Sequence, residues 1–530
     1  MNTDNQTERR PLPLGYQSFS DLREEGCYYV DKTPLIREMI RQGRYYFLSR
    51  PRRFGKSLLI DTLQELFEGN EPLFRGLDIH PHWDWSIRHP VARLTLDGKV
   101  STSEQLEDSL LSQLYKIEQA FNLELPPVRA SSERLRHILH QLHQATGRQA
   151  VVLVDEYDKP VLDLLEDSDK ARINRDHLRD VYSILKSSQK HIRFVFVTGI
   201  TMFSKTSFSS GLNNLVNISL SPRYAAICGY TDHDIDTVFA PELEGLDRQE
   251  IRRWYNGYSW LGEDKLYNPH DILHLFYERE FTEHWFQSGE PGYLYRMLER
   301  NRVTPMQVEN RVVDAALVSK FELDRFSHEA LLFQSGYLTI TKREVRGDNI
   351  LYHLDYPNYE VQRGFSKGLA EHLTGCGREI AQAGNELVKA LEDRDFPAFM
   401  AKVQAMLRGI PHAWHDSGNL GSYESWYASL LYMSFRTTPV ELKAEEMTSH
   451  GRSDMVLLHE GQVFVLEFKM AEGGENSEEK VKEGLDEALA QIRARGYAEK
   501  YRYLDQPIHL LGMVFGEKDR NLLDILVEKL

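Results

Sequence analysis

Cysteine is scarce in this sequence: Cys27, Cys228 and Cys376 are the only three in 530 residues. Their spacing matches neither a disulfide framework nor a metal-binding cysteine motif. No uninterrupted apolar run approaches the roughly twenty residues that a membrane-spanning helix requires, and the polar start, Met1 to Arg10, lacks the apolar segment of a signal peptide. The sequence therefore favours a soluble chain that makes no membrane contact and resides in a reducing cytoplasm.

Positive charge is also in deficit. The chain has 64 Lys and Arg against 80 Asp and Glu, so its net charge is −16. This balance argues against a protein that coats nucleic acid through bulk electrostatics, but it leaves room for a local basic groove. At 530 residues the chain is too long for one hydrophobic core, which predicts several domains.

The first informative stretch runs from Phe47 to Ser57 and predicts a strand, a tight loop and the start of a helix. Its last residues, Gly55, Lys56 and Ser57, form the end of a Walker A pattern. Backbone N–H groups at such a helix start bind phosphate, the lysine reaches the β and γ oxygens, and the serine hydroxyl binds Mg²⁺. Arg50 stands where the pattern has its first glycine, so the turn there must form without glycine's freedom at positive φ.

A second stretch, Ala150 to Asp158, is a β-branched apolar run that ends in acidic residues. It predicts a buried parallel strand with carboxylates at its C-terminal end, as in a Walker B motif. Asp155 would hold the Mg²⁺ shell, and Glu156 would orient or deprotonate the attacking water. A further strand from Ile192 to Gly199 ends at Thr198, which is either a sensor of the γ-phosphate or a strand cap.

The middle of the chain has weaker signals. The stretch Ser204 to Asn217 is rich in Ser, Gly and Asn and predicts a loop. From residue 223 the pattern becomes mainly helical and is interpreted as a helical lid. Helices followed by two strands near residues 336 and 352 indicate a winged-helix-like unit, which serves either in DNA binding or in interdomain packing.

A different constellation lies near the C-terminus, where two strands with a turn at His459 to Gln462 form a predicted hairpin. Period-two geometry places Glu467 and Lys469 on one face, and pairing across the turn brings Asp454 beside them. Two carboxylates can hold Mg²⁺, and the lysine can orient or help deprotonate the attacking water. Glu-x-Lys pairs are also common among exposed residues of ordinary strands, so the flanking pattern decides how strongly this pair indicates a metal site.

Those flanks predict an αβββαβ core. Its first helix, Tyr423 to Phe435, carries Glu424 as a third candidate carboxylate for the metal. Its second helix, Glu479 to Ala494, carries Gln491 as a candidate contact to the site or to the scissile strand. The pattern fits a solvated helix face equally well for both residues. The final strand is expected from His509 to Phe515.

Five segments together resemble the bacterial and archaeal AAA-ATPase-like proteins that carry a C-terminal PD-(D/E)XK nuclease domain. The resemblance covers nearly the whole chain, and Arg-Pro-Arg-Arg-Phe-Gly-Lys-Ser is similar to that family's own Walker A form. The segments are Tyr29 to Thr33, Arg50 to Ser57, Val154 to Asp158, Trp254 to Tyr258, and Gly451 to Asp454 with Glu467 to Lys469.

The resemblance implies ATP binding by Lys56, Ser57 and Asp155, hydrolysis assisted by Glu156, and Mg²⁺-dependent phosphodiester cleavage at Asp454, Glu467 and Lys469. It suggests a role in defence against phage or in control of mobile elements.

We therefore expect an α/β multidomain protein. The predicted parts are a P-loop AAA-like ATPase domain over 1–222, a helical lid over 223–308, a winged-helix-like unit over 309–366, a helical connector over 367–407 and a PD-(D/E)XK nuclease-like domain over 408–530. Residues expected to contact nucleotide are Arg52, Arg53, Phe54, Gly55, Lys56, Ser57, Asp155 and Thr198, and those expected to bind metal are Ser57, Asp155, Asp454, Glu467 and Glu424.

The expected function is ATP-regulated, Mg²⁺-dependent cleavage of DNA, with ATP and Mg²⁺ as cofactors. The alternative is a nucleotide-dependent module that binds nucleic acid or protein through an inactive nuclease-like fold. Arg52 or Arg53 would complete a neighbouring subunit's site in a homo-oligomer, or contact its own nucleotide. Sequence alone leaves open the choice between DNA and RNA, the activating signal and the oligomeric state.

Overall fold

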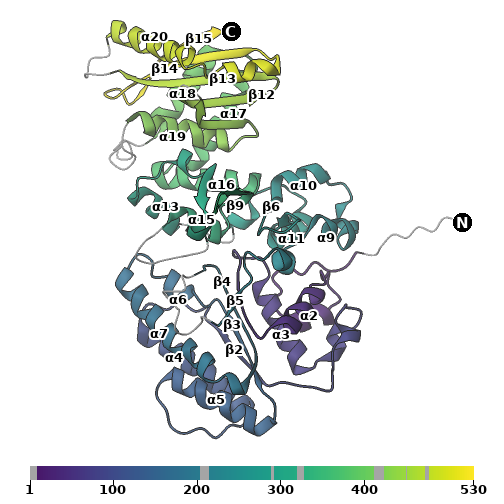
Figure 1. Ribbon diagram of the computed structural model, residues 1–530. Helices are drawn as coiled ribbons and strands as arrows, with labels where there is room; N and C mark the ends of the chain where they lie inside the picture. The colour runs from purple at the N-terminus through teal and green to yellow at the C-terminus, as the bar shows by residue number, and fades with distance from the viewer. Residues whose placement is uncertain are drawn as a thin grey trace, which may run out of the picture. The chain divides into compact units, whose positions relative to one another are not determined.

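The computed structural model describes residues 9–202, 214–287, 292–318, 327–410, 423–448, 451–471 and 477–530. The chain forms two compact units (Figure 1). The first unit comprises Met1–Trp285 and Val312–Tyr359, and the second comprises Phe286–Arg311 and Glu360–Leu530. The chain therefore crosses between the units at 285/286, 311/312 and 359/360.

The first unit is built on a five-stranded sheet in the order β2-β3-β4-β1-β5, and all its neighbouring strands are parallel. Figure 1 shows α3 on one face of this sheet and α4, α5 and α7 on the other. Both faces are thus covered, which explains why β3 and β4 are almost entirely apolar. The bounds are β1 Tyr45–Ser49, β2 Val91–Thr95, β3 Ala150–Asp155, β4 Ile192–Gly199, α3 Lys56–Glu68, α4 Ser103–Ala120, α5 Ser131–Thr146 and α7 Ser168–Ser187.

The parallel sheet predicted from the alternating pattern is confirmed. One strand was not expected: β5, Val216–Asn217, pairs with β1 inside the stretch predicted as a loop. A two-residue strand is too short to produce a periodic pattern, so it could not be predicted from the sequence. Residues 204–213 of that predicted loop lie outside the described residues.

The next part of the first unit is mainly helical. A core cluster joins its helices to Tyr28 and Val30 near the N-terminus, so that early segment packs here. The part also contains a two-stranded sheet that the helical prediction did not include. The bounds are α9 Asp232–Thr237, α10 Arg248–Tyr255, β6 Asn256–Tyr258, β7 Leu266–Tyr267, α11 Pro269–Glu278 and α12 His284–Gln287.

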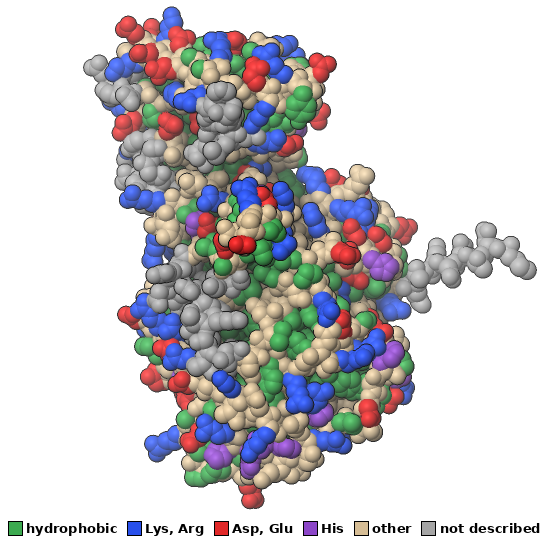
Figure 2. All heavy atoms as spheres, viewed as in Figure 1, with side chains coloured by type: hydrophobic (Ala, Val, Ile, Leu, Met, Phe, Trp, Pro, Cys, Tyr) green, Lys and Arg blue, Asp and Glu red, His purple; other side chains and the backbone are tan. Residues whose placement is uncertain are grey.

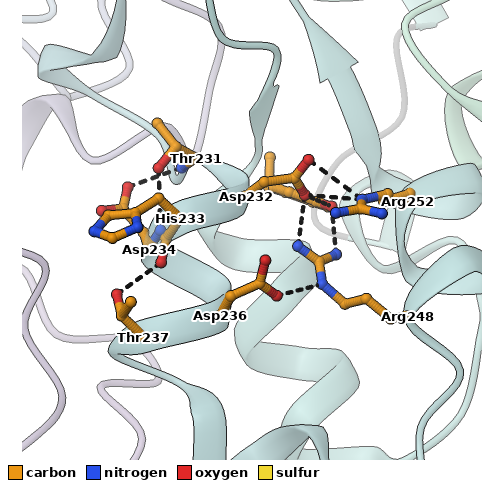
Figure 3. Close-up of polar contacts among 9 residues, drawn as sticks. Thr231, Asp232, His233, Asp234, Asp236, Thr237, Arg248 and Arg252 are labelled. Atoms are coloured by element: carbon orange, nitrogen blue, oxygen red, sulfur yellow. Dashed lines mark hydrogen bonds and ion pairs between the residues drawn. The ribbon is translucent and has the colours of Figure 1, made fainter.

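Charged side chains hold α9 against α10 (Figure 3). Asp232 accepts hydrogen bonds from Arg248 at 2.5 Å and from Arg252 at 3.2 Å, and Arg248 also donates to Asp236 at 2.7 Å. Thr231 begins α9 with a capping box in which Asp234 takes part. This network fixes α10, whose end continues directly into β6.

The remaining part of the first unit contains short helices followed by a β-hairpin, as the winged-helix-like prediction required. The hairpin strands β9 and β10 pair antiparallel and join β8 in a three-stranded sheet. The bounds are β8 Arg311–Asp314, α14 Ala315–Val318, α15 His328–Ser335, β9 Thr339–Arg346 and β10 Asn349–Asp355. The other helices of this unit are α1 Phe19–Glu24, α2 Thr33–Gln42 and α6 Lys159–Leu162.

The second unit contains the predicted αβββαβ core as α19, β11, β12, β13, α20 and β14, with sheet order β11-β12-β13-β14-β15. Strand β15 extends this core and was not predicted; it pairs antiparallel with β14. The bounds are α13 Gly292–Arg300, α16 Tyr359–Thr374, α17 Gly377–Glu392, α18 Phe396–Gly409, α19 Tyr423–Arg436, β11 Glu441–Thr448, β12 Gly451–His459, β13 Gln462–Ala471, α20 Glu478–Ala494, β14 Ile508–Gly516 and β15 Asn521–Lys529.

The compact units do not follow the five predicted domain ranges. The predicted lid and the predicted winged-helix-like unit each contribute residues to both units, because the chain crosses within both ranges. The five ranges stay predictions of functional parts. Among the residues that the structure describes, we find no helix with the length and apolar character needed to cross a bilayer.

Candidate nucleotide and metal sites

The loop between β1 and α3 has the geometry of a phosphate site. Gly55 precedes the helix with a φ of 86°, a conformation that glycine adopts without strain. No side chain caps the start of α3, so the N–H groups of its first turn, which includes Lys56 and Ser57, have no side-chain acceptor. Uncapped N–H groups and the positive end of the helix dipole suit a bound phosphate.

Lys56 lies beside the acidic end of β3. Its side chain is buried, and its Nζ donates a hydrogen bond to the Pro51 carbonyl at 2.9 Å. Burial lowers the pKa of Lys56, while the nearby charges of Asp155, Glu156 and Asp158 act in the opposite direction. The two predicted motifs therefore meet, with the lysine close to the carboxylates that would share its nucleotide.

Asp155 and Glu156 differ in their surroundings. Asp155 ends β3, is buried, and accepts a hydrogen bond from the Glu156 N–H at 3.0 Å. Glu156 has a φ of 52°, which is strained for a residue with a side chain. Burial raises the pKa of Glu156, and Lys56 partly offsets this rise. A carboxyl with a raised pKa at the end of such a strand suits a general base.

Strand β4 lies between β1 and β3, so Thr198 sits in the centre of the sheet. Thr198 is buried, and its hydroxyl donates to the Leu48 carbonyl at 2.9 Å. The hydroxyl proton is thus used within the sheet, and in this arrangement Thr198 can act on a nucleotide only as an acceptor. Its sensor role stays a prediction.

Asp158 was not singled out from the sequence. It is buried and accepts hydrogen bonds from the Ile200 and Thr201 N–H groups and from the Thr201 hydroxyl at 2.6 Å. It thereby ties the turn after β3 to the end of β4, which positions Glu156. The acidic run Asp-Glu-Tyr-Asp was the available signal, but it did not show which carboxylate points inward.

Arg50 explains the missing glycine of the phosphate loop. Its side chain is fully buried, and its guanidinium donates to the carbonyls of Ser49, Ser219, Tyr224 and Ala225 at 2.8 to 3.3 Å. The guanidinium carbon also lies 4.2 Å from the centroid of the Trp260 ring. Arg50 does not have the positive φ that would call for glycine. The arginine therefore anchors the base of the loop to two distant segments.

We expect Arg50→Met to lower the free energy of unfolding of the first unit by about 3 kcal/mol or more, because it leaves buried carbonyls without donors. Arg50→Gly, which restores the general Walker A glycine, is expected to destabilise the unit as well. Urea unfolding would measure both variants. The exposed neighbour Arg52 gives the control, since Arg52→Met should change stability by no more than about 0.5 kcal/mol. Equal stability of Arg50→Met and wild type would contradict the anchoring role.

The other predicted loop residues divide into two kinds. Arg52 and Arg53 are exposed, as contact with their own nucleotide or with a neighbouring subunit would require. Phe54 is buried, with its ring 4.8 Å from the ring of Tyr258 and 5.1 Å from that of Trp260. Its side chain therefore holds the loop against the segment after α10, and only its backbone remains for a contact with nucleotide.

The second site lies where β12 and β13 pair in the C-terminal sheet. Met455 is opposite Leu466 in the register, so Asp454 comes next to Glu467 across the two strands. Asp454 accepts a hydrogen bond from the Phe468 N–H at 2.8 Å, which fixes it at this place. The structure thus brings the two predicted carboxylates together.

The lysine and the glutamine complete this group. Lys469 Nζ lies 3.7 Å from Glu467 Oε1 and donates to Gln491 Oε1 at 2.9 Å. Gln491 also donates to Glu467 Oε1. Burial raises the pKa of Glu467 well above its ordinary value, and the charge of Asp454 adds to the rise. Lys469 and a hydrogen bond from the Asp454 backbone oppose it, and Glu424 contributes a smaller rise. All four predicted residues and Gln491 therefore act on one another electrostatically or by hydrogen bonds.

The residues fit a divalent cation with oxygen ligands. Glu467 is 1% exposed, and its Oε2 atom is buried without a hydrogen-bond partner. An unpaired buried carboxylate oxygen is costly, and a Mg²⁺ ion held with Asp454 would satisfy it. Glu424, on α19, acts on Glu467 through its charge, but in the described part of the chain it does not form a group of three ligand atoms within 4.8 Å of one another with Asp454 and Glu467. We infer that Asp454, Glu467 and Glu424 are the ligands to be tested.

The raised pKa of Glu467 predicts that metal binding releases protons. Near neutral pH and without metal the group holds its proton, and Mg²⁺ requires the ionised form, so metal affinity should rise with pH by up to about tenfold per unit until Glu467 ionises. Without metal, folding becomes less favourable as the pH rises from the pKa of Glu467 in the unfolded chain to its raised pKa in the folded protein, because the buried carboxyl must then ionise. Titration calorimetry in two buffers of different ionisation enthalpy would count the protons released.

The matched control for this prediction is Glu487→Gln, which removes an exposed carboxylate from α20 and should leave proton release unchanged. Glu467→Gln should abolish it. A Mg²⁺ affinity at this site that is independent of pH would show that Glu467 is already ionised in the free protein.

These two sites and folds define an ATPase-like P-loop domain joined to a nuclease-like domain of the PD-(D/E)XK type. The comparisons agree: residues 13–209 match the family described as predicted AAA-ATPase, and residues 422–524 match the PD-(D/E)XK nuclease superfamily. The chain belongs to the family of AAA-ATPase-like proteins that carry a C-terminal PD-(D/E)XK nuclease domain.

A full-length relative supports this assignment. The chain is 44% identical over 524 residues to an uncharacterized protein in the vnfD 5′ region of Azotobacter chroococcum mcd 1, and the match covers 98% of this chain and 99% of the relative. Among solved structures, the ORC1 protein of Aeropyrum pernix in complex with DNA aligns with 66% of this chain and 95% of its own, at 12% identity and a TM-score of 0.25.

Proposed function

We propose that this protein is an ATP-regulated nuclease that cleaves DNA with the help of Mg²⁺. The observation that carries the proposal is the buried, partnerless Oε2 atom of Glu467 beside Asp454 and Lys469. Replacing a buried charged group by an apolar side chain of similar volume is often neutral or stabilising, so a fold that only binds gains little from a carboxylate here. Its presence supports a working metal site.

The residues of the C-terminal site have separable tasks in this proposal. Mg²⁺, when bound, would polarise the scissile phosphate and stabilise charge that develops on its oxygens. Asp454 and Glu467 hold the ion. Lys469, which is fixed through Gln491, orients the attacking water and opposes the negative charge that builds up.

The N-terminal site would bind ATP through the N–H groups at the start of α3, with Lys56 on the β and γ oxygens and Ser57 and Asp155 on the Mg²⁺ shell. Glu156 would orient the attacking water. The exposed position of Arg52 and Arg53 supports a homo-oligomer in which a neighbour's arginine completes the site. We also propose a cytoplasmic location.

A second candidate is a nucleotide-dependent module that recognises nucleic acid or protein without cutting. The charge distribution favours it: the chain carries a net −16, and Figure 2 shows acidic and basic side chains interspersed over the face drawn. An acidic surface lowers non-specific affinity for DNA. Cleavage would then need a partner or a local groove to bring the DNA to Asp454.

Cleavage assays on purified wild type, Lys56→Ala and Asp454→Ala separate the two functions. Supercoiled plasmid, linear duplex and single-stranded DNA would each be incubated with Mg²⁺ or Mn²⁺, with and without ATP. The proposal expects cleavage by wild type, none by Asp454→Ala, and an altered response to ATP in Lys56→Ala. ATP hydrolysis without cleavage in any substrate would favour the binding module.

The biological setting that we propose is defence against phage or control of mobile elements. Cells that carry the wild-type gene should then reduce plaque formation or transfer of an element, and cells that carry the Asp454→Ala form should not. An equal effect of both forms would point to the binding module instead.

A further inference from the structure

Three side chains at the end of α11 and the start of α12 form a cluster that neither proposed activity uses. His274 and Glu278 lie one helical turn apart on α11, and His284 begins α12. One ligand atom from each lies within 4.8 Å of the other two. Among the residues that the structure describes, this is the one such group of three or more His, Cys, Asp or Glu side chains.

The spacing of the cluster is close to that of a tetrahedral metal site. His274 Nδ1 lies 3.2 Å from Glu278 Oε1, and His284 Nδ1 lies 3.6 Å from Glu278 Oε2. Ligand atoms on a tetrahedral Zn²⁺ ion are roughly 3.3 Å apart, given metal–ligand bonds of about 2 Å. Both separations are near this value, and each ends on a different oxygen of Glu278, so the carboxylate faces both imidazoles.

The orientation of His284 supplies an independent observation. Its Nε2 lies 3.2 Å from the Glu280 carbonyl, which can only accept, so Nε2 carries the proton. The other nitrogen, Nδ1, is buried, has no hydrogen-bond partner, and points at the Glu278 carboxylate. A lone pair would thus face a negatively charged oxygen, an arrangement that a cation between them stabilises.

The surroundings hold His284 in this position. Its side chain is 1% exposed, and its ring lies 6.0 Å from that of Tyr255 in a stacked arrangement. The Tyr255 hydroxyl donates to the Thr282 carbonyl at 3.0 Å, and the His284 N–H donates to the same carbonyl at 3.0 Å. These contacts hold the turn before α12 in place without a bound ion, and such preorganisation favours a metal site.

We propose that His274, Glu278 and His284 bind one Zn²⁺ ion, with water in the fourth position. Two imidazole nitrogens and one carboxylate form a ligand set that suits Zn²⁺ better than Mg²⁺, which prefers oxygen ligands. His274 and Glu278 are 31% and 38% exposed, which leaves an open side for the water and for entry of the ion. The ion would clamp the end of α11 to the segment that leaves the first unit at residues 285/286.

The same cluster without metal would be two ordinary histidine–glutamate pairs. His80 and Glu71 show what such a pair looks like in this protein: their nitrogen and oxygen are also 3.2 Å apart, and His80 is also 31% exposed. Neither residue belongs to a group of three ligands in the described part of the chain. His80→Ala is therefore a matched control for His274→Ala.

Zn²⁺ binding to the full chain would be measured by competition with a chromophoric chelator, in excess Mg²⁺ so that sites made of oxygen ligands are occupied. Wild type and His80→Ala should bind one Zn²⁺ per chain with the same affinity. His274→Ala and Glu278→Gln should bind about a hundredfold more weakly or not at all, because each loses a ligand. With Co²⁺ in place of Zn²⁺, the wild type and His80→Ala should show the absorption bands of four-coordinate Co²⁺. His274→Ala and Glu278→Gln, which each lack a ligand, should not.

Thermal unfolding provides the second readout, since a ligand that binds the folded state raises the melting temperature. Zn²⁺ should raise it for wild type and His80→Ala but not for His274→Ala. Both substituted side chains are partly exposed, so the variants should fold. The proposal is overturned if wild type binds no Zn²⁺ under these conditions, or if His274→Ala and His80→Ala bind it equally well.

Discussion

Replacing Asp454 by Asn should reduce DNA cleavage by about a thousandfold and leave ATP hydrolysis unchanged. The loss of a charged metal ligand removes several kcal/mol of transition-state stabilisation, which corresponds to a factor of this size. Asn retains an oxygen at the position where Asp454 accepts a hydrogen bond from Phe468 at 2.8 Å, so the strand pairing should survive. Initial rates of plasmid nicking with Mg²⁺ would measure the effect.

Asp524→Asn is the matched control for this experiment. Asp524 lies on β15 in the same sheet, is exposed, and its side chain accepts a hydrogen bond from the Ile525 N–H of its own strand at 2.8 Å. It should cleave at the wild-type rate. Cleavage by Asp454→Asn at the rate of the Asp524 control would mean that Asp454 does not hold a metal needed for the reaction.

The second large effect concerns ATP. Lys56→Ala should reduce ATP hydrolysis by about a hundredfold to a thousandfold, since the ammonium group placed beside Asp155 and Glu156 is lost from the phosphate site. Glu156→Gln should reduce hydrolysis by a similar factor but keep ATP binding, because Gln removes the base and leaves the phosphate contacts intact. Phosphate release would measure ATP hydrolysis, and binding of a fluorescent ATP analogue would measure ATP binding, so the two effects can be separated in each variant.

Lys170→Ala is the control, because Lys170 lies at the surface on α7 with its ammonium 3.0 Å from Asp167. Its hydrolysis rate should match wild type. If Glu156→Gln hydrolyses ATP at the wild-type rate, another group must activate the water, and Asp158 would be the nearest carboxylate to examine.

Much of the site could be predicted from short patterns because those patterns act locally. Gly55 begins α3 with the positive φ that the motif requires, and the apolar run that ends in Asp155 can only be a buried strand. In the C-terminal sheet, alternation along β13 together with a short turn was enough to set Asp454 beside Glu467.

Arg50 shows where this reasoning stopped. The sequence marks it as an irregularity in a motif, while the structure buries it against the carbonyls of Ser219, Tyr224 and Ala225, about 170 residues away along the chain. The partners of Arg50 cannot be read from local periodicity. Strand β15 is a different case: it follows β14 through a short turn and pairs antiparallel with it, but its apolar residues do not alternate strictly, so it was not predicted.

The sequence by itself determined the chemistry of this protein: which side chains can hold phosphate and metal, and on which strands and helices they lie. It did so because helix and strand periods and turn residues depend on neighbours close along the chain. Only the tertiary structure decided which side chains from segments far apart in the sequence meet. The surroundings of the Glu467 carboxylate and of the Arg50 guanidinium depend on packing between segments far apart in the sequence, and the place of His284 beside Glu278 depends on the turn between α11 and α12.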